Sequence, residues 1–431
     1  MALTSDRSYI KIDGQKELTL NRSLLEYTNP TTVAIPLKNL DFEDFAINVE
    51  VGDYVKIGTK LAIGNDHNKL PLFSSVSGTV TAIEKRDHIA LKKANHIIIE
   101  NDFKNETELL FEPKEIEAYT DAEIKEHMRS AGVLGLSGSG VPTFTKFRNT
   151  KNVTAILVNA IESEPLITAD QYNISTNPEL LIKGCLAIMK AADAKECTIV
   201  LTEDQNSLYE NIVSLSKNYQ GIIVKQLPYT YPIGFERYLI EILFQKKFKI
   251  TPVEVGIISL NSSTIIEFAK TLITGLPLYE RVITLAGNGY VNSQNVKVRI
   301  GTILKDIISE IGGLVPNIPK TARLVHGGPL RGGAVISDNL SVTPITNGFT
   351  CIFNEDDVTI ACSRCGDCIA SCPEDLQPIQ IVRAFKRKDK DILKLYGADK
   401  CIECGICSYV CPSFIDVTDG AKRAKAFTLQ K

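Results

Sequence analysis

The sequence predicts a multidomain protein of the mixed α/β class, and three observations lead to that prediction. The chain has 431 residues, more than a single hydrophobic core normally supports. Its apolar residues change pattern along the chain, from short alternating runs to a strand-and-helix alternation and back. Eight of the 11 cysteines lie between positions 362 and 411, so the last part of the chain is expected to form a unit of its own.

The composition narrows the class of protein. Apolar residues make up 44% and charged residues 23%, as in ordinary soluble globular proteins, and a net charge of −3 gives no reason to expect nucleic-acid binding. No apolar run reaches the ~18 residues of a membrane span, and no apolar stretch follows a basic start at the N-terminus. We therefore expect neither a transmembrane segment nor a signal peptide, and any contact with a membrane should go through a partner protein.

Residues 30–105 are predicted to form a small sandwich of β-hairpins. Apolar positions alternate along Val51–Gly64 and Ser74–Glu84, with turn residues between the runs. The pattern resembles the barrel-sandwich hybrid of lipoyl and biotinyl domains, in which a lysine at a hairpin tip accepts the cofactor. Lys69 lies near that place, but its neighbours do not form the usual acceptor tripeptide, so an exposed turn lysine is the favoured interpretation.

Residues 120–275 alternate between predicted helices and buried strands, which indicates a largely parallel sheet covered by helices. Helices are expected at 121–132, 180–192 and 232–245. Strands are expected at 153–160 and 197–202. Residues 281–350 return to short strands around a helix at 303–313, which predicts a β-grasp module. The cysteine-rich residues 355–431 are predicted to be helical.

Two copies of one cysteine motif carry the clearest chemistry. The runs CSRCGDCIASCP and CIECGICSYVCP each follow the pattern C-x2-C-x2-C-x3-C-P. In such a run three thiolates bind one [4Fe–4S] cluster and the fourth reaches the other cluster, as in ferredoxins. The predicted ligands are Cys362, Cys365, Cys368 and Cys411 for the first cluster, and Cys372, Cys401, Cys404 and Cys407 for the second. Zinc is the alternative, but zinc ligands usually come as two separated pairs without a Cys-Pro ending.

A glycine-rich loop and a polar turn mark a second candidate site. Gly135, Gly138 and Gly140 would let backbone N–H groups approach a phosphate, although a flexible loop is the simpler interpretation of the glycines alone. The loop matches neither a Rossmann motif nor a P-loop. A buried strand then ends in a polar turn, which is well placed for a ligand crevice unless it is merely solvated. The polar residues of that turn are Asn159, Glu162 and Glu164.

The order of these features resembles a known family across essentially the whole chain. The order is sandwich domain, glycine-rich loop, Asn-x-x-Glu-x-Glu-Pro turn, YPIGFERYLI, β-grasp module, HGGPLRGG and double cysteine motif. It resembles the C subunit of the Rnf electron-transport complex, and the middle part is also similar to the flavin- and NADH-binding 51-kDa subunit of respiratory complex I.

The resemblance implies an oxidoreductase subunit of a membrane-bound complex that couples electron transfer between NADH and ferredoxin to ion translocation. The implied cofactors are two [4Fe–4S] clusters and FMN, with NADH as a substrate. The implied partners are the other subunits of the complex and ferredoxin or another small electron carrier. The subunit would lie on the cytoplasmic side of the membrane as a peripheral component.

The family pattern also assigns roles within the second candidate site. By resemblance, the three loop glycines would line the phosphate or ring of FMN, and the polar turn would contact flavin and nicotinamide. Ser137, Ala160 and Phe235 are bulkier than the residues usual in the family, so we expect flavin binding to be kept better than NADH oxidation. The alternative function is a soluble electron-transfer adaptor that has lost NADH oxidation, similar to proline-reductase-associated or cobalamin-reducing relatives.

The run Arg383–Lys390 lies between the two cysteine motifs and is the most basic patch of the chain. The solvated face of a helix is the favoured interpretation. A docking site for an acidic ferredoxin or partner subunit is the alternative.

Overall fold

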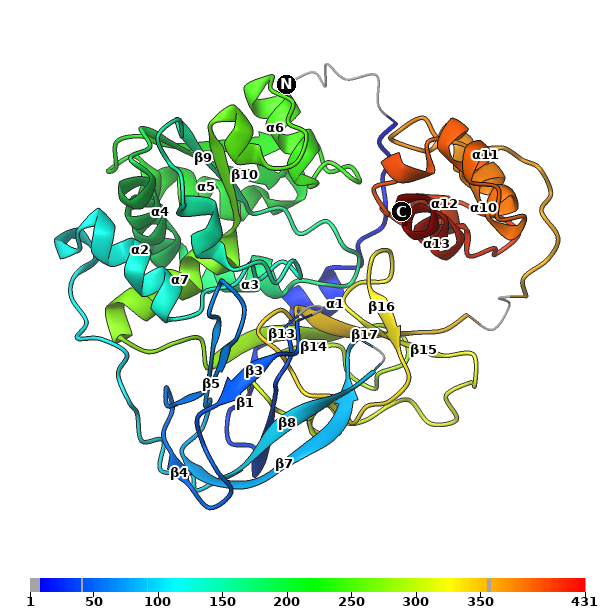
Figure 1. Cartoon of the computed structure of the whole chain (residues 1–431). Coiled ribbons are helices and arrows are strands. Elements are labelled where there is room, and N and C mark those ends of the chain that lie inside the picture. The colour runs from blue at the N-terminus through cyan, green and yellow to red at the C-terminus, as the bar shows by residue number, and fades with distance from the viewer. Residues whose placement is uncertain (1–7, 40–41, 91, 355–357, 431) are drawn as a thin grey trace.

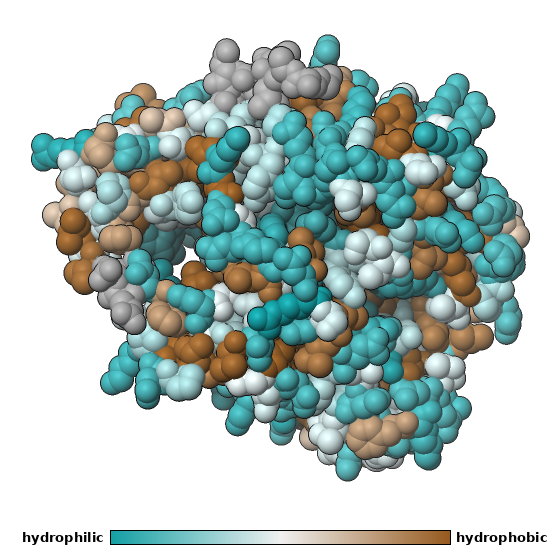
Figure 2. All heavy atoms as spheres, turned by 180° about the vertical axis from the view of Figure 1, so that it is seen from behind, coloured by the Kyte–Doolittle hydropathy of each residue, from teal (hydrophilic) through white to brown (hydrophobic). Residues whose placement is uncertain are grey.

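The computed structural model describes residues 8–39, 42–90, 92–354 and 358–430. Within these residues the strands form four sheets, and a separate group of helices carries the C-terminal end of the chain (Figure 1). Seen from behind, the surface mixes polar and apolar residues (Figure 2). In the described part of the chain, no helix combines the length and the hydropathy needed to cross a membrane.

Two small antiparallel sheets build the first domain, as the alternating runs predict. The strands are β2 (Thr32–Pro36), β8 (Lys92–Asn101), β7 (Gly78–His88) and β4 (Tyr54–Val55) in one sheet, and β3 (Phe45–Ile47), β5 (Lys60–Gly64) and β6 (Pro71–Phe73) in the other. Residues of β7 alternate between buried and exposed at its start, so one face of the strand packs inward. Val55, Leu61 and Ile97 meet in the core between the sheets.

A parallel sheet forms the second domain. Its strands, in spatial order, are β11 (Ile222–Leu227), β10 (Glu196–Thr202), β9 (Ala155–Asn159) and β12 (Ile257–Asn261). Side chains of β9 point alternately into two apolar clusters, with Ile156 and Val158 in one and Leu157 in the other. Both faces of the sheet are therefore covered, which explains why the sequence of β9 is a continuous apolar run.

The order of the strands reverses next to β9. Strands β10 and β11 extend the sheet on one side of β9, and β12 is added on its other side. The carboxyl ends of β9 and β12 meet at Asn159 and Asn261, which are paired in register. Ligands of open parallel sheets bind at such a switch point, so the topology itself marks this edge as a candidate site.

The second domain also contains six α-helices. They are α2 (Asp121–Ser130), α3 (Ala169–Thr176), α4 (Pro178–Ala192), α5 (Asn206–Ser216), α6 (Glu236–Phe244) and α7 (Ser262–Thr274). Helix α2 begins with a capping box between Thr120 and Glu123, as its acidic first turn suggests. Helix α6 begins later than the predicted residue 232, because the segment before it forms a turn and Phe235 adopts an extended N-cap conformation.

A six-stranded mixed sheet with α8 (Leu304–Glu310) forms the third domain. Its order is β1 (Leu25–Tyr27), β14 (Gln294–Arg299), β13 (Glu280–Ala286), β17 (Gly348–Ile352), β15 (Arg323–His326) and β16 (Gly333–Val335). The N-terminal strand β1 pairs in parallel with β14, a long-range contact that the local pattern did not predict. The N-terminal segment starts beside the C-terminal helices and runs from there to α1 (Glu17–Leu20), which precedes β1 (Figure 1).

The C-terminal module is helical, as its sequence predicts. Its helices are α9 (Asp367–Ala370), α10 (Pro378–Lys386), α11 (Lys390–Leu395), α12 (Ile406–Tyr409) and α13 (Val417–Leu429). Buried Leu376, Ile381, Leu393 and Ala421 form its small core. Short helices α9 and α12 each begin just before the third cysteine of a motif, so the two motifs have the same local shape.

Candidate functional sites

The structure gathers the eight motif cysteines into two groups. A cavity of about 150 Å³ is lined by Cys362, Cys365, Cys368 and Cys411. A smaller cavity is lined by Cys372, Cys401, Cys404 and Cys407. Each group takes three cysteines from one motif and the last cysteine from the other, which is the crossed arrangement that the spacing predicts.

The geometry of these groups suits a multinuclear cluster better than a single ion. Among the described residues, no three histidine, cysteine or carboxylate side chains converge closely enough to hold one metal ion. A four-iron cluster instead spreads its four thiolates over four irons, with sulfide between them. The sharing of one cysteine across the two motifs fits such clusters, whereas zinc ligands usually come as two separated pairs.

Burial of the second group has a chemical consequence. It raises the pKa of both Cys404 and Cys407 to about 12, so as free thiols they would stay protonated at neutral pH. Thiolates are the form that binds iron, and the positive charge of the metal would stabilise them. Cys365 of the first group is exposed, so the two groups sit in different environments.

The carboxyl edge of the parallel sheet holds the second candidate site. The Asn159 side chain donates to the Gly234 carbonyl (2.9 Å) and accepts from the Ile161 N–H (3.1 Å), which fixes the start of the polar turn. On the neighbouring strand, the Asn261 side chain accepts from the Thr264 N–H and thereby caps α7. Both asparagines thus shape the crevice edge.

The N-terminus of α7 favours negative charge, and the Asp170 carboxylate already lies beside it, where it accepts from the side chains of Asn261 (2.7 Å) and Ser263 (2.6 Å). Ser262 is fully buried, and its hydroxyl has no hydrogen-bond partner among the described residues. The Leu136 N–H donates to the Thr264 hydroxyl (2.9 Å), which holds the glycine-rich loop against the first turn of the helix. An unpartnered buried hydroxyl beside a helix N-terminus fits a phosphate group, because the N–H groups and the helix dipole both favour negative charge.

The glycine-rich loop keeps the open shape that a close ligand needs. Gly138 and Gly140 have φ angles of +87° and +58°, which favour glycine over residues with a side chain. A Cβ atom added to Gly138 would have open space around it, with no described atom within 4 Å. The Ser139 hydroxyl turns back to donate to the Gly135 carbonyl (3.3 Å), and so does not block the loop from outside.

Two charged residues of the crevice, Lys146 and Glu236, were not predicted from the sequence. The Lys146 ammonium donates to the Ser259 carbonyl (2.7 Å) and lies 4.0 Å from a Glu236 carboxylate oxygen. Burial lowers the pKa of Lys146. The sequence does contain a signal for Lys146. The lysine follows soon after the glycine-rich loop and lies between Phe144 and Phe147, and the two phenylalanines indicate a buried segment.

The polar turn, residues 159–167, is buried rather than solvated. The Glu162 carboxylate accepts from the Asp170 N–H (3.2 Å), and burial, reinforced by the charge of Asp170, raises the pKa of Glu162 to about 8. One oxygen of Glu164 accepts from the Leu330 N–H (3.2 Å), and the other has no partner among the described residues. Burial raises the pKa of Glu164 also, although the nearby Arg331 opposes the shift.

Lys16 anchors this turn from the N-terminal segment. Its buried ammonium donates to the carbonyls of Glu162 (2.9 Å), Glu164 (2.6 Å) and Ile167 (2.6 Å). The Leu166 N–H donates in turn to the Gly14 carbonyl (2.7 Å). The sequence pattern did not single out Lys16, because its partners are about 150 residues away along the chain.

Phe235, one of the three bulky departures from the family pattern, packs toward the second cysteine group. Phe235 packs with Tyr231 in an apolar cluster that includes Cys404, and the Arg331 guanidinium lies 4.6 Å from the centre of the Phe235 ring. The Tyr231 hydroxyl donates to the Cys404 carbonyl (2.5 Å). The second cysteine group therefore adjoins the crevice, and Phe235 stands between the two.

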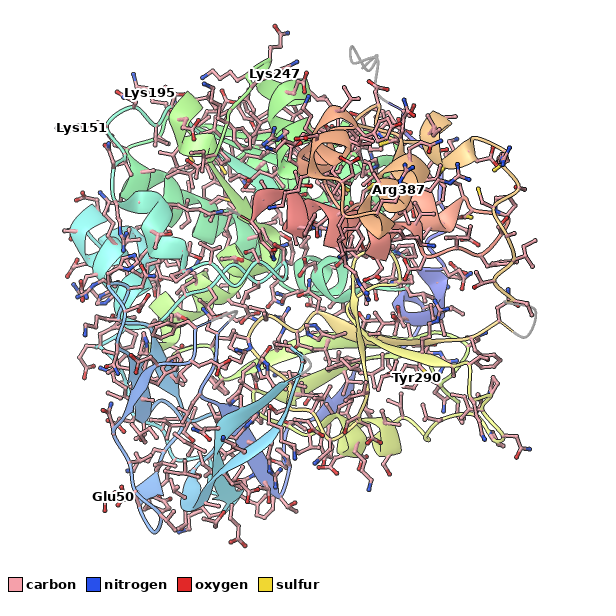
Figure 3. The ribbon with its side chains drawn as sticks, turned by 45° about the vertical axis from the view of Figure 1, so that its right-hand side comes forward. Glu50, Lys151, Lys195, Lys247, Tyr290 and Arg387 are labelled. Carbon is pink, nitrogen blue, oxygen red and sulfur yellow. The ribbon has the colours of Figure 1, made fainter. Side chains whose placement is uncertain are left out.

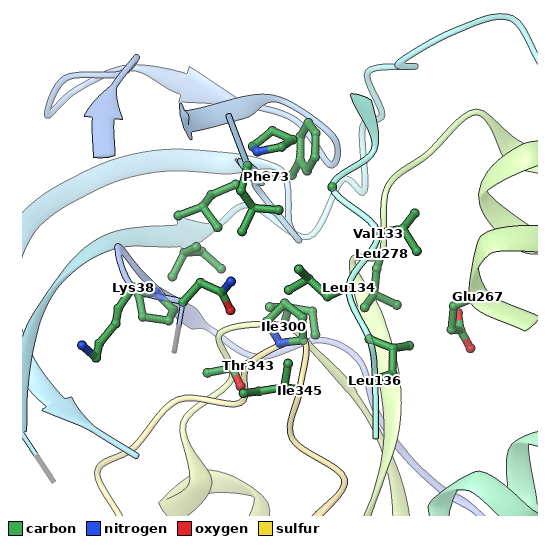
Figure 4. Close-up of a pocket in the computed structure, with 18 of the residues that line it drawn as sticks. Lys38, Phe73, Val133, Leu134, Leu136, Glu267, Leu278, Ile300, Thr343 and Ile345 are labelled. Atoms are coloured by element: carbon green, nitrogen blue, oxygen red, sulfur yellow. The ribbon is translucent and has the colours of Figure 1, made fainter. Parts of the chain in front are cut away.

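Two further features lie near this site, and the first shares residues with it, because Gly138 of the glycine-rich loop and Thr264 of α7 line a cavity. This mainly apolar cavity of about 340 Å³ lies behind the glycine-rich loop, and Figure 4 shows Leu134 and Leu136 of the loop together with Phe73 and Ile300 around it. None of the polar-turn residues lines that cavity. Lys69 is exposed in the turn between β5 and β6, where its neighbour Asn68 accepts from Arg148 of the second domain (2.9 Å).

Comparison with known proteins gives three family matches along the chain. Residues 7–104 match the RnfC barrel-sandwich hybrid domain, residues 128–270 the Nuo51 FMN-binding domain, and residues 361–415 a 4Fe-4S dicluster domain. These matches confirm the predicted fold class. An NAD+-reducing [NiFe]-hydrogenase in the H2-reduced state has a similar fold, with a TM-score of 0.52 and 16% identity over 75% of this chain and 66% of the other.

Curated relatives match most of the chain. The C subunit of the Na+-translocating ferredoxin:NAD+ oxidoreductase complex of Acetobacterium woodii is 29% identical over 382 residues, which cover 86% of this chain and 85% of that protein. The C subunit of the ion-translocating oxidoreductase complex of Buchnera aphidicola subsp. Baizongia pistaciae is 31% identical over 405 residues, covering 90% and 77%. With this identity and coverage, the chain belongs to the family of C subunits of ion-translocating oxidoreductase complexes.

Proposed function

We propose that this chain is the electron-transfer subunit of a complex that moves electrons between ferredoxin and NAD+ and couples this transfer to ion translocation. The cysteine geometry carries the proposal. Each crossed set of four cysteines lines its own cavity, and the second set adjoins the edge of the parallel sheet through the hydrogen bond from Tyr231 to Cys404. A flavin site at the sheet edge, followed by two iron–sulfur clusters, is an arrangement that suits stepwise electron transfer.

The two [4Fe–4S] clusters are assigned to the crossed sets. The ligands of the first cluster are Cys362, Cys365, Cys368 and Cys411, and those of the second are Cys372, Cys401, Cys404 and Cys407. The proposed domain boundaries are 30–105, 120–275, 281–350 and 355–431, so that the clusters occupy a module of their own.

FMN is assigned to the carboxyl edge of the parallel sheet. The phosphate would lie at the N-terminus of α7, near the unpartnered Ser262 hydroxyl, and the open face of the loop with Gly135, Gly138 and Gly140 would lie along the flavin. When bound, FMN supplies the conversion between two-electron and one-electron transfer. Asn159 holds the turn at the crevice, and Lys146 supplies a positive charge beside it.

The two carboxyl groups of the polar turn would then act differently from exposed ones. Burial raises the pKa of Glu162 to about 8, so its carboxyl group takes up a proton more readily than an exposed one, and in the protonated form it donates a hydrogen bond as well as accepting one. Glu164 keeps one oxygen without a partner among the described residues, which a ribose hydroxyl of NADH could satisfy.

A second candidate function, an adaptor that does not oxidise NADH, is favoured by one contact. The loop from the β-grasp module covers Glu164 through the Leu330 N–H, and Arg331 of the same loop lies over Phe235. This loop stands where a nicotinamide would have to approach the polar turn. Flavin binding would be unaffected, because the glycine-rich loop and α7 lie apart from this contact.

The deciding experiment uses anaerobically purified protein loaded with FMN, whose binding is followed by the quenching of flavin fluorescence. Full function predicts that added NADH lowers the flavin absorption and then bleaches the broad absorption of the clusters. The adaptor predicts tight FMN binding with no reduction by NADH, whereas dithionite still bleaches the clusters. A protein with intact clusters that does not bind FMN would contradict the crevice assignment.

We also propose that the subunit lies peripherally on the cytoplasmic side of the membrane, held by the other subunits. The relatives are subunits of ion-translocating complexes, and no described helix here is suited to span a bilayer. In native membranes, a high-salt or chaotropic wash should release the protein, because a protein–protein attachment needs no detergent. A subunit that stays bound until detergent is added would contradict this placement.

A further inference from the structure

The two cysteine motifs have matching backbones, so their surroundings can be compared position by position. The second residue after the first cysteine has a left-handed conformation in both motifs, with φ angles of +63° at Arg364 and +58° at Glu403. The glycine after the second cysteine is also left-handed in both, with +89° at Gly366 and +88° at Gly405. We call residues 363–369 the first loop and residues 402–408 the second loop.

The second loop is covered by the rest of the chain. A Cβ atom added to Gly405 would lie only 2.5 Å from the Leu330 carbonyl oxygen. The Tyr231 hydroxyl donates to the carbonyl of Cys404, which is 8% exposed. Two other parts of the same chain, the second domain with Tyr231 and the β-grasp module with Leu330, thus cover this loop.

The first loop has the same shape and no such cover among the described residues. A Cβ atom added to Gly366 would have no described atom within 4 Å. Cys365, the counterpart of Cys404, is exposed, and so is Arg364. The described residues therefore cover the second loop and leave the first loop uncovered.

Exposed apolar side chains surround the open loop. Ile360 is 57% exposed and Phe414 is 47% exposed, and backbone contacts hold their segments together: the Ile360 N–H donates to the Ser413 carbonyl, and the Thr359 hydroxyl donates to the Phe414 carbonyl (both 3.1 Å). Ile369 within the loop is also exposed. Single exposed apolar residues are ordinary, but a group of them beside one cavity marks a contact surface.

The charges beside this surface are mainly positive. Arg364 stands in the loop, Arg383 lines the same cavity from α10, and the exposed Lys386 and Arg387 follow one turn later (Figure 3 labels Arg387). Neither Arg364 nor Arg383 has an ion pair with a residue that the structure describes. Asp367 is the one acidic side chain of the first loop, whereas at the second loop Glu403 is paired with Lys425 (2.9 Å).

We propose that the first loop, with its apolar rim and the basic side chains of α10, docks an acidic protein that carries a one-electron centre near its surface. This proposal rests on the proposed function. One electron would pass between that centre and the first cluster, so that one is oxidised as the other is reduced and no covalent bond changes. Positive charge selects and steers an acidic partner, and the apolar rim excludes water from the contact.

The test uses the full-length protein with both clusters and a reduced, acidic [2Fe–2S] ferredoxin as the probe. Stopped-flow mixing measures the second-order rate of cluster reduction as a function of ionic strength. The double variant Arg364→Glu/Arg383→Glu should react about tenfold more slowly at low salt and show a weaker salt dependence. Ile360→Ser should slow the reaction at high salt as well, because apolar contact is not screened by ions.

Matched controls separate docking from damage to the clusters. Lys151→Glu/Lys195→Glu makes the same change of charge on the far side of the molecule (Figure 3) and should leave the rate nearly unchanged. Dithionite should bleach the clusters equally in all variants. If it does so while the double variant still reacts with wild-type rate and salt dependence, the docking surface is wrong although the clusters are right. Absence of clusters in the wild type would instead overturn the proposed function and the docking proposal together.

Discussion

Removing two cysteines should cost either one cluster or both, depending on which two are chosen. In the crossed assignment Cys365 and Cys411 serve the same cluster, so the variant Cys365→Ala/Cys411→Ala should keep about half of the ~8 iron atoms per chain. Cys404 and Cys411 serve different clusters, so Cys404→Ala/Cys411→Ala should lose nearly all of the iron. Iron and acid-labile sulfide analysis of anaerobically purified protein gives both numbers.

The opposite outcome is equally clear. If each motif held its own cluster, Cys404→Ala/Cys411→Ala would keep half of the iron and Cys365→Ala/Cys411→Ala would lose both clusters. Cys185→Ala is the control, because Cys185 is buried in the core of the second domain and should lose no iron. Stoichiometric zinc without sulfide in the wild type would refute iron–sulfur ligation altogether.

The crossed grouping of the cysteines could be predicted because it follows from their spacing along the chain, whereas their ligation of clusters stays a prediction. Three thiolates separated by two residues each can reach one cluster from a single short loop, and only the fourth needs a partner motif. The parallel sheet was predictable for a similar reason: β9 and β10 are buried runs with helices between them, so the local pattern carries the topology. Element ends were less certain, as the later start of α6 shows.

The contacts between domains could not be predicted, because they join residues far apart in the chain. Tyr231 and Cys404 are 173 positions apart, and nothing local to either residue indicates their hydrogen bond. The same applies to Phe235. The family pattern predicts that Phe235 crowds the nicotinamide, and nothing in that pattern indicates that its ring also packs in the apolar cluster beside Cys404. A substitution that seems harmful in a motif can therefore serve packing between domains.

Replacing Lys16 by methionine should weaken FMN binding by about tenfold without removing either cluster. Methionine keeps much of the length of the side chain but loses the charge and all three hydrogen bonds to the polar turn. Each buried carbonyl left without a donor costs about 1–3 kcal/mol, partly offset because an ammonium no longer has to be buried. The turn that carries Asn159 and Glu162 would then move more freely, and the crevice would be less well organised for its ligand.

Titration with FMN, followed by fluorescence quenching, measures this loss, and the iron content of the same samples shows whether the clusters are intact. Lys11→Met is the matched control, since Lys11 lies on the same N-terminal segment but is exposed to solvent. Lys16→Arg keeps the charge in a bulkier group and should recover only part of the affinity, because three carbonyls close around the ammonium leave little room for a planar guanidinium. If Lys16→Met bound FMN as tightly as the wild type, the anchor would serve stability alone. The lysine holds backbone carbonyls of the turn that shapes the crevice. We therefore expect Lys16→Met to lower the affinity for FMN more clearly than it lowers the unfolding temperature.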